Sequence, residues 1–228
     1  MVQPVHPIEF RMISQNDNSS RRGKVAIITG HYVEETELFR VIRQLRASQI
    51  DYEVLTPPSL VNPSGTLTSM HWGATLRQGN EIELGENFRV SRSLSDMILS
   101  YEYAALALPG GILSVTLLRE SPEYIIFIQD FSTTERPILW MGFAPLLALS
   151  ANILPGKTLT SNPTIRSEIT AAGAHWLDQG MVQGENWIST RDIDALTLGV
   201  PRFVELLELP EVIRSQTVRS QIAKARLS

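Results

Sequence analysis

Residues 137–145 read P-I-L-W-M-G-F-A-P, the pattern of a short apolar strand, a tight turn and the start of a helix. Such an elbow can hold a nucleophile in a strained backbone position at the end of a strand. Here the elbow carries Gly142 and Phe143, and the chain contains no cysteine. Two interpretations of the glycine stay open. It relieves the strain of the turn, or its missing side chain makes room for a larger ligand.

Backbone N–H groups from two turns could hold negative charge at this elbow. We expect the N–H of Phe143 to point into a crevice, together with N–H groups near Gly110 and Gly111 in the sequence L-P-G-G. Converging N–H groups form a nest for an anion or an oxyanion. Gly110, Gly111, Gly142 and Phe143 are therefore the predicted ligand-binding residues.

Glu34 and His31 are the titratable residues best placed for proton transfer, because both follow the first predicted strand. A structural interpretation of Glu34 is that the helix dipole favours acids at the start of a helix. The functional one is that a carboxyl facing Phe143 in apolar surroundings has a raised pKa and acts as a general acid or base. His31 could shuttle a proton, although a lone histidine there is more often at the surface or hydrogen-bonded. His6 and His175 have no metal-ligand spacing, and we predict neither a metal nor a cofactor.

Short apolar runs that end at glycine or proline predict buried parallel strands. They lie at residues 25–29, 52–56, 104–108, 138–141 and 157–160, and residues 181–183 and 187–190 could pair as a hairpin. Helices are predicted around residues 38–45, 122–131, 144–151, 165–172 and 195–207, with Gly173 as a left-handed stop. Residues 57–100 are less regular, and short strands are expected around 81–84 and 88–90. The alternation predicts an α/β fold, a parallel-sheet sandwich with helices on both faces.

The order of these elements predicts where a ligand would bind. Open α/β sheets bind ligands at the carboxyl ends of their strands. Glu34 follows the first strand, Gly110 and Gly111 follow the Ala104 strand, and the elbow follows the strand at 138–141. We expect all three to converge on one crevice.

Six segments, taken in order, resemble the ThiJ/PfpI superfamily, which shares the class I glutamine-amidotransferase-like fold. They span about residues 24–207. The segments are V-A-I-I-T-G with V-E-E, Y-A-A-L-A-L-P-G-G, P-I-L-W-M-G-F-A-P, L-P-G-K-T-L-T-S-N-P, A-G-A-H-W-L-D and N-W-I-S-T-R. The resemblance implies a flavodoxin-like sandwich and a homodimer.

The departures from that family pattern bear on activity. The family's elbow is P-V-A-A-I-C-H-G-P, so its nucleophilic cysteine falls on Gly142 and the histidine beside it on Phe143. Its acidic partner falls on Glu34, and its R-x-P-x-D-L stretch is reduced to R-D-I-D-A-L at residues 191–196. The peptidase, deglycase, glyoxalase and isonitrile-hydratase activities of the family work through the cysteine. The resemblance therefore implies none of them for this chain.

Composition excludes several classes of function. The chain has 228 residues, of which 43% are apolar and 19% charged, as in globular proteins. Its net charge of −4 gives no basic field for nucleic acid. No apolar run is long enough to span a membrane, and we expect neither a secretory signal nor a membrane partner. The lack of cysteine agrees with a cytoplasmic location. No G-x-G-x-x-G follows the first strand, where G-H-Y-V-E-E stands, so a dinucleotide is not implied.

The predicted organisation is a flexible arm at residues 1–22, one domain at 23–209 and a basic tail at 210–228. Two functional hypotheses follow. The first is an enzyme without a covalent step, of the isomerase, lyase, hydratase or cyclase type, in which Glu34 transfers a proton on a small carbonyl-like or unsaturated substrate. The second is a ligand-binding or regulatory protein without catalysis.

Overall fold

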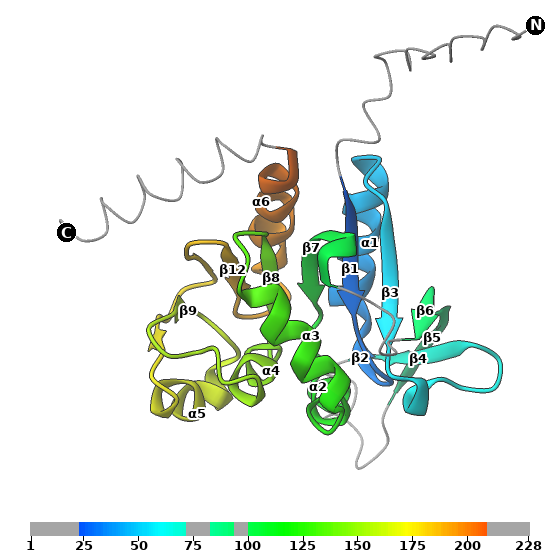
Figure 1. Cartoon of the computed structure of the whole chain (residues 1–228), viewed down its shortest axis with the longest axis horizontal. Coiled ribbons are helices and arrows are strands. Elements are labelled where there is room, and N and C mark those ends of the chain that lie inside the picture. Colours follow the sequence, from blue (N-terminus) through cyan, green and yellow to red (C-terminus); the bar gives the residue numbers. More distant parts are fainter. Residues whose placement is uncertain (1–22, 72–82, 94–99, 209–228) are drawn as a thin grey trace, which may run out of the picture.

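The computed structural model describes residues 23–71, 83–93 and 100–208. The predicted arm and tail, His6 and the first part of the strand expected at 81–84 lie outside these residues. Within them, the chain forms a seven-stranded sheet in the order β11-β12-β8-β7-β1-β3-β6 (Figure 1). All neighbouring strands are parallel except β11, which pairs with β12 as an antiparallel hairpin.

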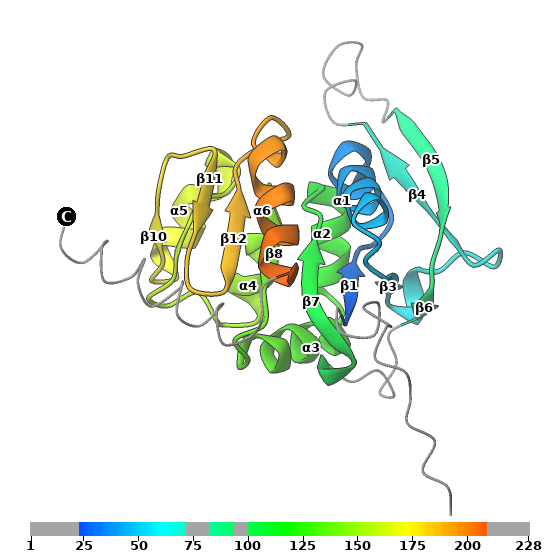
Figure 2. The ribbon, with the colours of Figure 1, turned by 90° about the horizontal axis from the view of Figure 1, so that it is seen from above.

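The strands of this sheet follow the apolar runs of the sequence. They are β1 (Lys24–Ile28), β3 (Tyr52–Thr56), β6 (Arg92–Ser93), β7 (Tyr103–Leu108), β8 (Ile138–Met141), β11 (Met181–Gln183) and β12 (Trp187–Thr190). Two small sheets lie at opposite ends of the main one (Figures 1 and 2). One contains β2 (Val33–Glu34), β4 (Thr66–Met70) and β5 (Leu84–Arg89), and the other β9 (Thr158–Leu159) and β10 (His175–Trp176).

Helices cover both faces of the sheet, and each face has its own apolar core. One core lies under α1 (Glu35–Ala47) and α6 (Leu196–Glu208). The other lies under α2 (Ile112–Arg119), α3 (Pro122–Ser132), α4 (Pro145–Ser150) and α5 (Arg166–Ala171). Short 3-10 turns complete the fold at η1 (Pro58–Leu60), η2 (Ser100–Glu102) and η3 (Pro163–Ile165).

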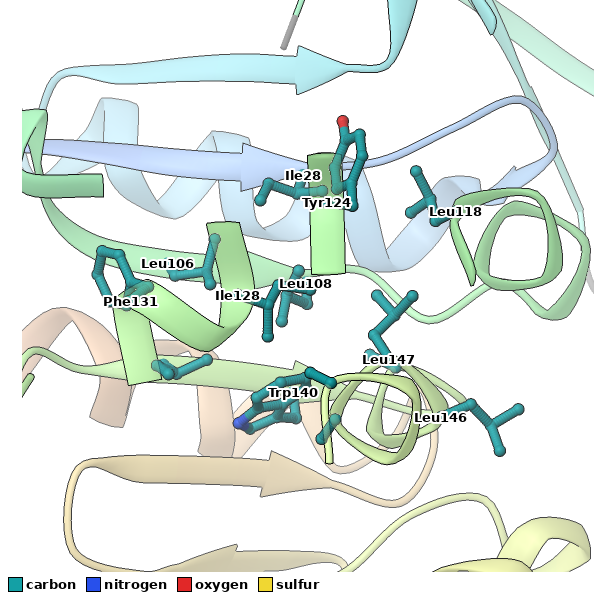
Figure 3. Close-up of a cluster of buried hydrophobic side chains, with 14 of the residues drawn as sticks. Ile28, Leu106, Leu108, Leu118, Tyr124, Ile128, Phe131, Trp140, Leu146 and Leu147 are labelled. Carbon is teal, nitrogen blue, oxygen red and sulfur yellow. The ribbon is translucent and has the colours of Figure 1, made fainter. Parts of the chain in front are cut away.

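The central strands supply both cores because successive side chains point to opposite faces. On β1, Val25 and Ile27 face α1 and α6, whereas Ile28 faces the other layer. Figure 3 shows the second core, where Ile28 lies near Tyr124 of α3 and Trp140 lies near Leu147 of α4. These buried strands fix the carboxyl edge of the sheet, where the loops of the candidate site begin.

The predicted α/β sandwich is confirmed. Four strands have the predicted bounds, namely β3, β8, β11 and β12, and Gly173 has the expected left-handed backbone after α5, with φ +87°. Among the α-helices and strands, those that the sequence pattern did not predict are α2, β2, β4, β6 and β10. In the described part of the chain, no helix is long and apolar enough to cross a bilayer.

Candidate active site

The elbow between β8 and α4 is held by its backbone. Gly142 has a left-handed φ of +51°, and its N–H donates to the carbonyl of Thr190 on β12 at 3.0 Å. Its own carbonyl accepts the N–H of Asn162 at 2.9 Å. The helix then begins at Pro145, where a missing N–H costs nothing. Two segments distant in sequence from the elbow therefore fix the position of the bend.

Gly110 and Gly111 are required by close packing of the loop after β7. A Cβ on Gly110 would collide with the carbonyl oxygen of Met141 and the N of Phe143. A Cβ on Gly111 would collide with the backbone N of Glu34. Glycine is the residue that permits such backbone approaches. The two glycines of P-G-G thus allow this loop to pack between the elbow and the segment that carries the acids.

Glu37 is the carboxylic acid nearest to the elbow. Its side chain is buried, at 4% exposed, and its Oε2 accepts the N–H of Gly110. A Cβ built on Gly142 would lie 2.7 Å from its Oε1, so the carboxyl faces the bend. Burial raises the pKa of Glu37 from 4.5 to about 8; the charge of Glu34 adds to this rise, and the Gly110 hydrogen bond opposes it. Glu37 therefore holds a proton at neutral pH.

Glu34 lies one helical turn earlier and lines the same cleft. It is the N-cap of α1, and its Oε2 accepts the N–H of Glu37 at 3.0 Å. The predicted structural role at a helix start is therefore confirmed. Glu34 is 5% exposed, so both carboxyls are largely buried at one end of α1.

The neighbouring acid, Glu35, points elsewhere. Its Oε2 accepts the hydroxyl of Ser69 at 2.6 Å and the N–H of Glu86 at 2.7 Å, which ties α1 to the small sheet of β4 and β5. Burial acts to raise the pKa of Glu35, but these hydrogen bonds and the charge of His71 outweigh it and lower the pKa. The sequence E-E-T-E thus directs its first and last acids to the cleft and its middle acid to a structural contact.

The cleft at this edge has a volume of about 270 Å³. It is built from loops that follow the carboxyl ends of β7, β8 and β12, together with the start of α1, as expected for an open α/β sheet. Its lining residues are Glu34, Glu37, Gly110, Gly111, Ile112, Gly142, Phe143, Asn162, Arg191, Asp192, Ile193 and Asp194. The predicted convergence of Glu34, the glycine pair and the elbow is therefore present. Phe143 lines the cleft and also packs against the core under α2–α5.

Arg191 is the cationic residue of this lining, and it is paired with two acids. Its Nε lies 2.8 Å from Asp192 Oδ2, and its Nη1 lies 3.0 Å from Asp178 Oδ1. Asp192 Oδ1 also accepts the N–H of Ala195 just before α6. Asp194 is exposed at the same loop. The β12–α6 side of the cleft therefore presents aspartates and a guanidinium that is already paired.

Two of the expected features take a different form. His31 is not among the residues that line the cleft in the described part of the chain, and its Nδ1 accepts the N–H of Thr68 on β4 at 3.2 Å. The expected anion nest is also altered, because the N–H of Phe143 donates to the carbonyl of Gly110 at 3.2 Å. The N–H of Gly110 donates to Glu37. Each of these two N–H groups therefore already has an acceptor within the protein, because the two turns and the Glu37 carboxyl pack closely together.

The sequence reasoning missed Glu37 and the acids of the β12–α6 loop. The available signal for Glu37 was its spacing, because residues three apart share a face of a helix. Nothing in the sequence alone ranked Glu37 above Glu34. Among the described residues, no group of three or more histidine and acidic side chains could hold a metal ion.

Comparison with protein families shows to which family this chain belongs. A model of the DJ-1/PfpI family matches residues 23–205, which is most of the chain. The chain belongs to the DJ-1/PfpI family. A relative of similar extent is the protein named deglycase PH1704 of Pyrococcus horikoshii, which is 25% identical over 81% of this chain and 99% of its own length. Deglycase TK1284 of Thermococcus kodakarensis is 32% identical over 46% of this chain, and the match covers 63% of that relative, just under two thirds of its length.

Solved structures of DJ-1-like proteins share this fold. Schizosaccharomyces pombe DJ-1 superposes with a TM-score of 0.67 at 18% identity, covering 87% of this chain and 97% of that one. A two-domain protein from Anabaena variabilis with DJ-1/ThiJ/PfpI-like and ferritin-like domains gives 0.68 at 22% identity, covering 83% of this chain and 49% of that one. These likenesses show the fold. Within this DJ-1/PfpI protein, the elbow presents glycine above a buried glutamic acid.

Proposed function

We propose that this DJ-1/PfpI protein is a cofactor-free acid–base enzyme that moves a proton on a small carbonyl or unsaturated compound, as an isomerase, lyase, hydratase or cyclase does. The observation that carries the proposal is the pair of buried carboxyls, Glu34 and Glu37, that line one cleft at the elbow. Such a pair can divide the roles of acid and base when the surroundings separate their proton affinities.

The surroundings support different roles for the two acids. Glu37 keeps its proton at neutral pH because it is buried, so it can donate a hydrogen bond to a substrate oxygen. Glu34 is at the N-terminus of α1 and accepts a helix N–H, which favours its negative charge. It can therefore accept a proton from the carbon beside the carbonyl. In an α-hydroxy carbonyl compound, the C–H electrons form the C=C bond of an enediol while the carbonyl oxygen takes the Glu37 proton. Glu34 then returns its proton to the former carbonyl carbon, and the hydroxyl on the other carbon gives its proton back to Glu37, which yields the isomer and restores both acids.

The cleft favours a small substrate without negative charge. Its volume of about 270 Å³ lies below the range of about 300–1,000 Å³ that is typical of drug-sized ligands. Asp192 and Asp194 line the β12–α6 side, and the guanidinium of Arg191 is already paired with Asp192 and with Asp178. A phosphate or carboxylate group would meet like charges there.

The relatives named deglycases do not extend that activity to this chain. The family resemblance implies a cysteine nucleophile at the position of Gly142, and this chain has no cysteine. General acid–base catalysis contributes about 10²–10⁴-fold without a covalent step. That range suits an activated carbonyl compound and is too small for peptide hydrolysis.

A second candidate function is binding without catalysis. One observation favours it: the N–H groups of Phe143 and Gly110 donate within the protein, so both are already used where an oxyanion would otherwise be held. In that case the cleft would hold a small ligand, and the carboxyls would recognise its hydroxyl or amino groups.

Hydrogen exchange at carbon separates the two functions. Hydroxyacetone in D₂O, followed by ¹H NMR, reports enolisation and conversion to lactaldehyde in one spectrum. We expect the protein to accelerate loss of the carbon-bound signals. Glu37→Gln and Glu34→Gln should each reduce that rate by about 10²-fold or more, whereas Glu168→Gln, at an exposed site on α5, should not change it.

The outcomes of this experiment are distinct. Line broadening of hydroxyacetone with no exchange would favour the binding function. Exchange that persists unchanged in Glu37→Gln and Glu34→Gln would contradict the proposed acid–base pair. The homodimer and the cytoplasmic location, which the family resemblance and the composition suggest, stay predictions, and sedimentation velocity would test the dimer.

A further inference from the structure

The backbone conformation at the elbow does not by itself require glycine. Gly142 has φ +51°. Elsewhere in the described residues the chain places side chains at similar angles, with Gln49 at +54° and Asn152 at +52°. A left-handed φ costs a non-glycine residue about 1–2 kcal/mol, and this fold accepts that cost at other turns. A second reason for glycine at 142 must lie in its contacts.

That contact is the carboxyl of Glu37. Of the three nearest atoms that a Cβ on Gly142 would meet, Glu37 Oε1 lies at 2.7 Å, and Glu37 Cδ and the carbonyl oxygen of Gly110 both lie at 3.7 Å. By contrast, Gly65 and Gly156 also have positive φ angles, of +72° and +74°, and a Cβ on either would meet no atom within 4 Å. Conformation explains the glycine at those two turns, whereas at 142 the carboxyl already occupies the space.

Moving the Glu37 carboxyl out of that space would disturb its hydrogen bond with Gly110. The other carboxyl oxygen of Glu37 accepts the N–H of Gly110, and Glu37 itself is buried. The N–H of Gly110 belongs to the loop that packs against Met141 and Phe143. A methyl group at 142 would therefore push Oε1 away from the bend, and the Gly110 hydrogen bond would lengthen or break.

We infer that Gly142 is a positioning residue: its missing side chain lets the Glu37 carboxyl stand against the elbow, at the place where a side chain would otherwise lie. The acid thus takes up space at the bend that a residue with a Cβ would claim. This inference rests on the proposed function for its catalytic meaning, but its geometry can be tested without a substrate.

The test compares Gly142→Ala with Gly156→Ala. Both variants add a methyl group at a left-handed position, but only the first places it against Glu37. In a ¹H–¹⁵N NMR pH titration, the amide of Gly110 should follow the ionisation of Glu37 in the unchanged protein and in Gly156→Ala. In Gly142→Ala that pH-dependent shift should fall by about half or more, because the hydrogen bond that transmits it is weakened.

Activity supplies an independent readout. In the hydroxyacetone exchange assay, kcat should fall about tenfold or more in Gly142→Ala and stay within about twofold in Gly156→Ala. If the unchanged protein exchanges nothing, the proposed function fails, yet the Gly110 titration still decides the inference. If Gly142→Ala keeps the full Gly110 titration, the positioning role is overturned.

A double variant keeps the test decisive if Gly142→Ala folds poorly. Glu37→Asp shortens the acid by one methylene and makes room for the methyl group. Gly142→Ala should then lower Tm less in the Glu37→Asp background than in the unchanged protein, a coupling typical of residues in contact. Equal losses of Tm in the two backgrounds would contradict the contact and overturn the inference.

Discussion

At the scale of single residues, three neighbouring acids have separate roles because α1 turns them in different directions. Glu34 and Glu37 lie three residues apart and face the cleft, whereas Glu35 is hydrogen-bonded to Ser69 and Glu86. The sequence could indicate that acids cluster at this helix start. It could not show which one meets the elbow, because that depends on how α1 is rotated against β8.

The separate role of Glu35 predicts a structural effect without a functional one. Glu35→Gln removes a charge that accepts two hydrogen bonds, so we expect a loss of about 1–3 kcal/mol in the free energy of unfolding. Amide hydrogen exchange should speed up in β4 and β5, which the acid ties to α1. The titration of Glu37 should be unchanged. A change in that titration with intact β4 and β5 protection would show that Glu35 acts on the cleft.

At the scale of elements, the strands formed by buried apolar runs could be predicted from the sequence. Very short elements, and helices without clear capping residues, could not. The runs I-L-W-M and W-I-S-T gave β8 and β12 with their observed bounds. Helix α2 escaped prediction because it begins at Ile112, directly after Gly111, with no side-chain cap, and it contains the β-branched Val115 and Thr116. Strand β2 has only two residues, too few to show a period.

The glycine-rich loop between β7 and α2 predicts a severe effect of one methyl group. In Gly110→Ala the new Cβ would collide with backbone atoms of Met141 and Phe143, which cannot turn aside as a side chain can. We expect a loss of about 3 kcal/mol or more in the free energy of unfolding. Gly180→Ala is the matched control, since its Cβ would only touch the Cβ of Ala195 at 3.5 Å. Similar urea midpoints for the two variants would show that the loop can move.

At the scale of the whole molecule, the sheet could be predicted and the pairing across the site could not. The alternation of strands and helices was sufficient for the α/β sandwich and for a cleft at the carboxyl edge. The contact of Glu37 with Gly142 joins residues about a hundred positions apart and depends on both cores packing against one sheet. A local sequence pattern cannot predict a contact between residues so far apart in the chain.

That buried contact couples the stability of the whole domain to pH. Glu37 has a raised pKa of about 8 in the fold, against 4.5 as its ordinary value, because it is buried. Between these two pH values the unfolded chain has released the proton that the folded chain retains. Stability therefore falls as pH rises through this window. The contribution of Glu37 is complete below about pH 4.5 and lost above about pH 8.

Replacement of the acid by its amide removes this dependence. Urea unfolding at pH 5, 6, 7, 8 and 9 should show the unchanged protein losing stability relative to Glu37→Gln, by at most about 1.4 kcal/mol per pH unit. Acids with lowered pKa, such as Glu53 and Asp192, contribute equally to both proteins and cancel in the difference. Glu168→Gln should run parallel to the unchanged protein, since Glu168 is exposed. Parallel curves for Glu37→Gln as well would mean that the carboxyl beneath the elbow ionises as it would in water, and the acid role proposed for it would then lack its physical basis.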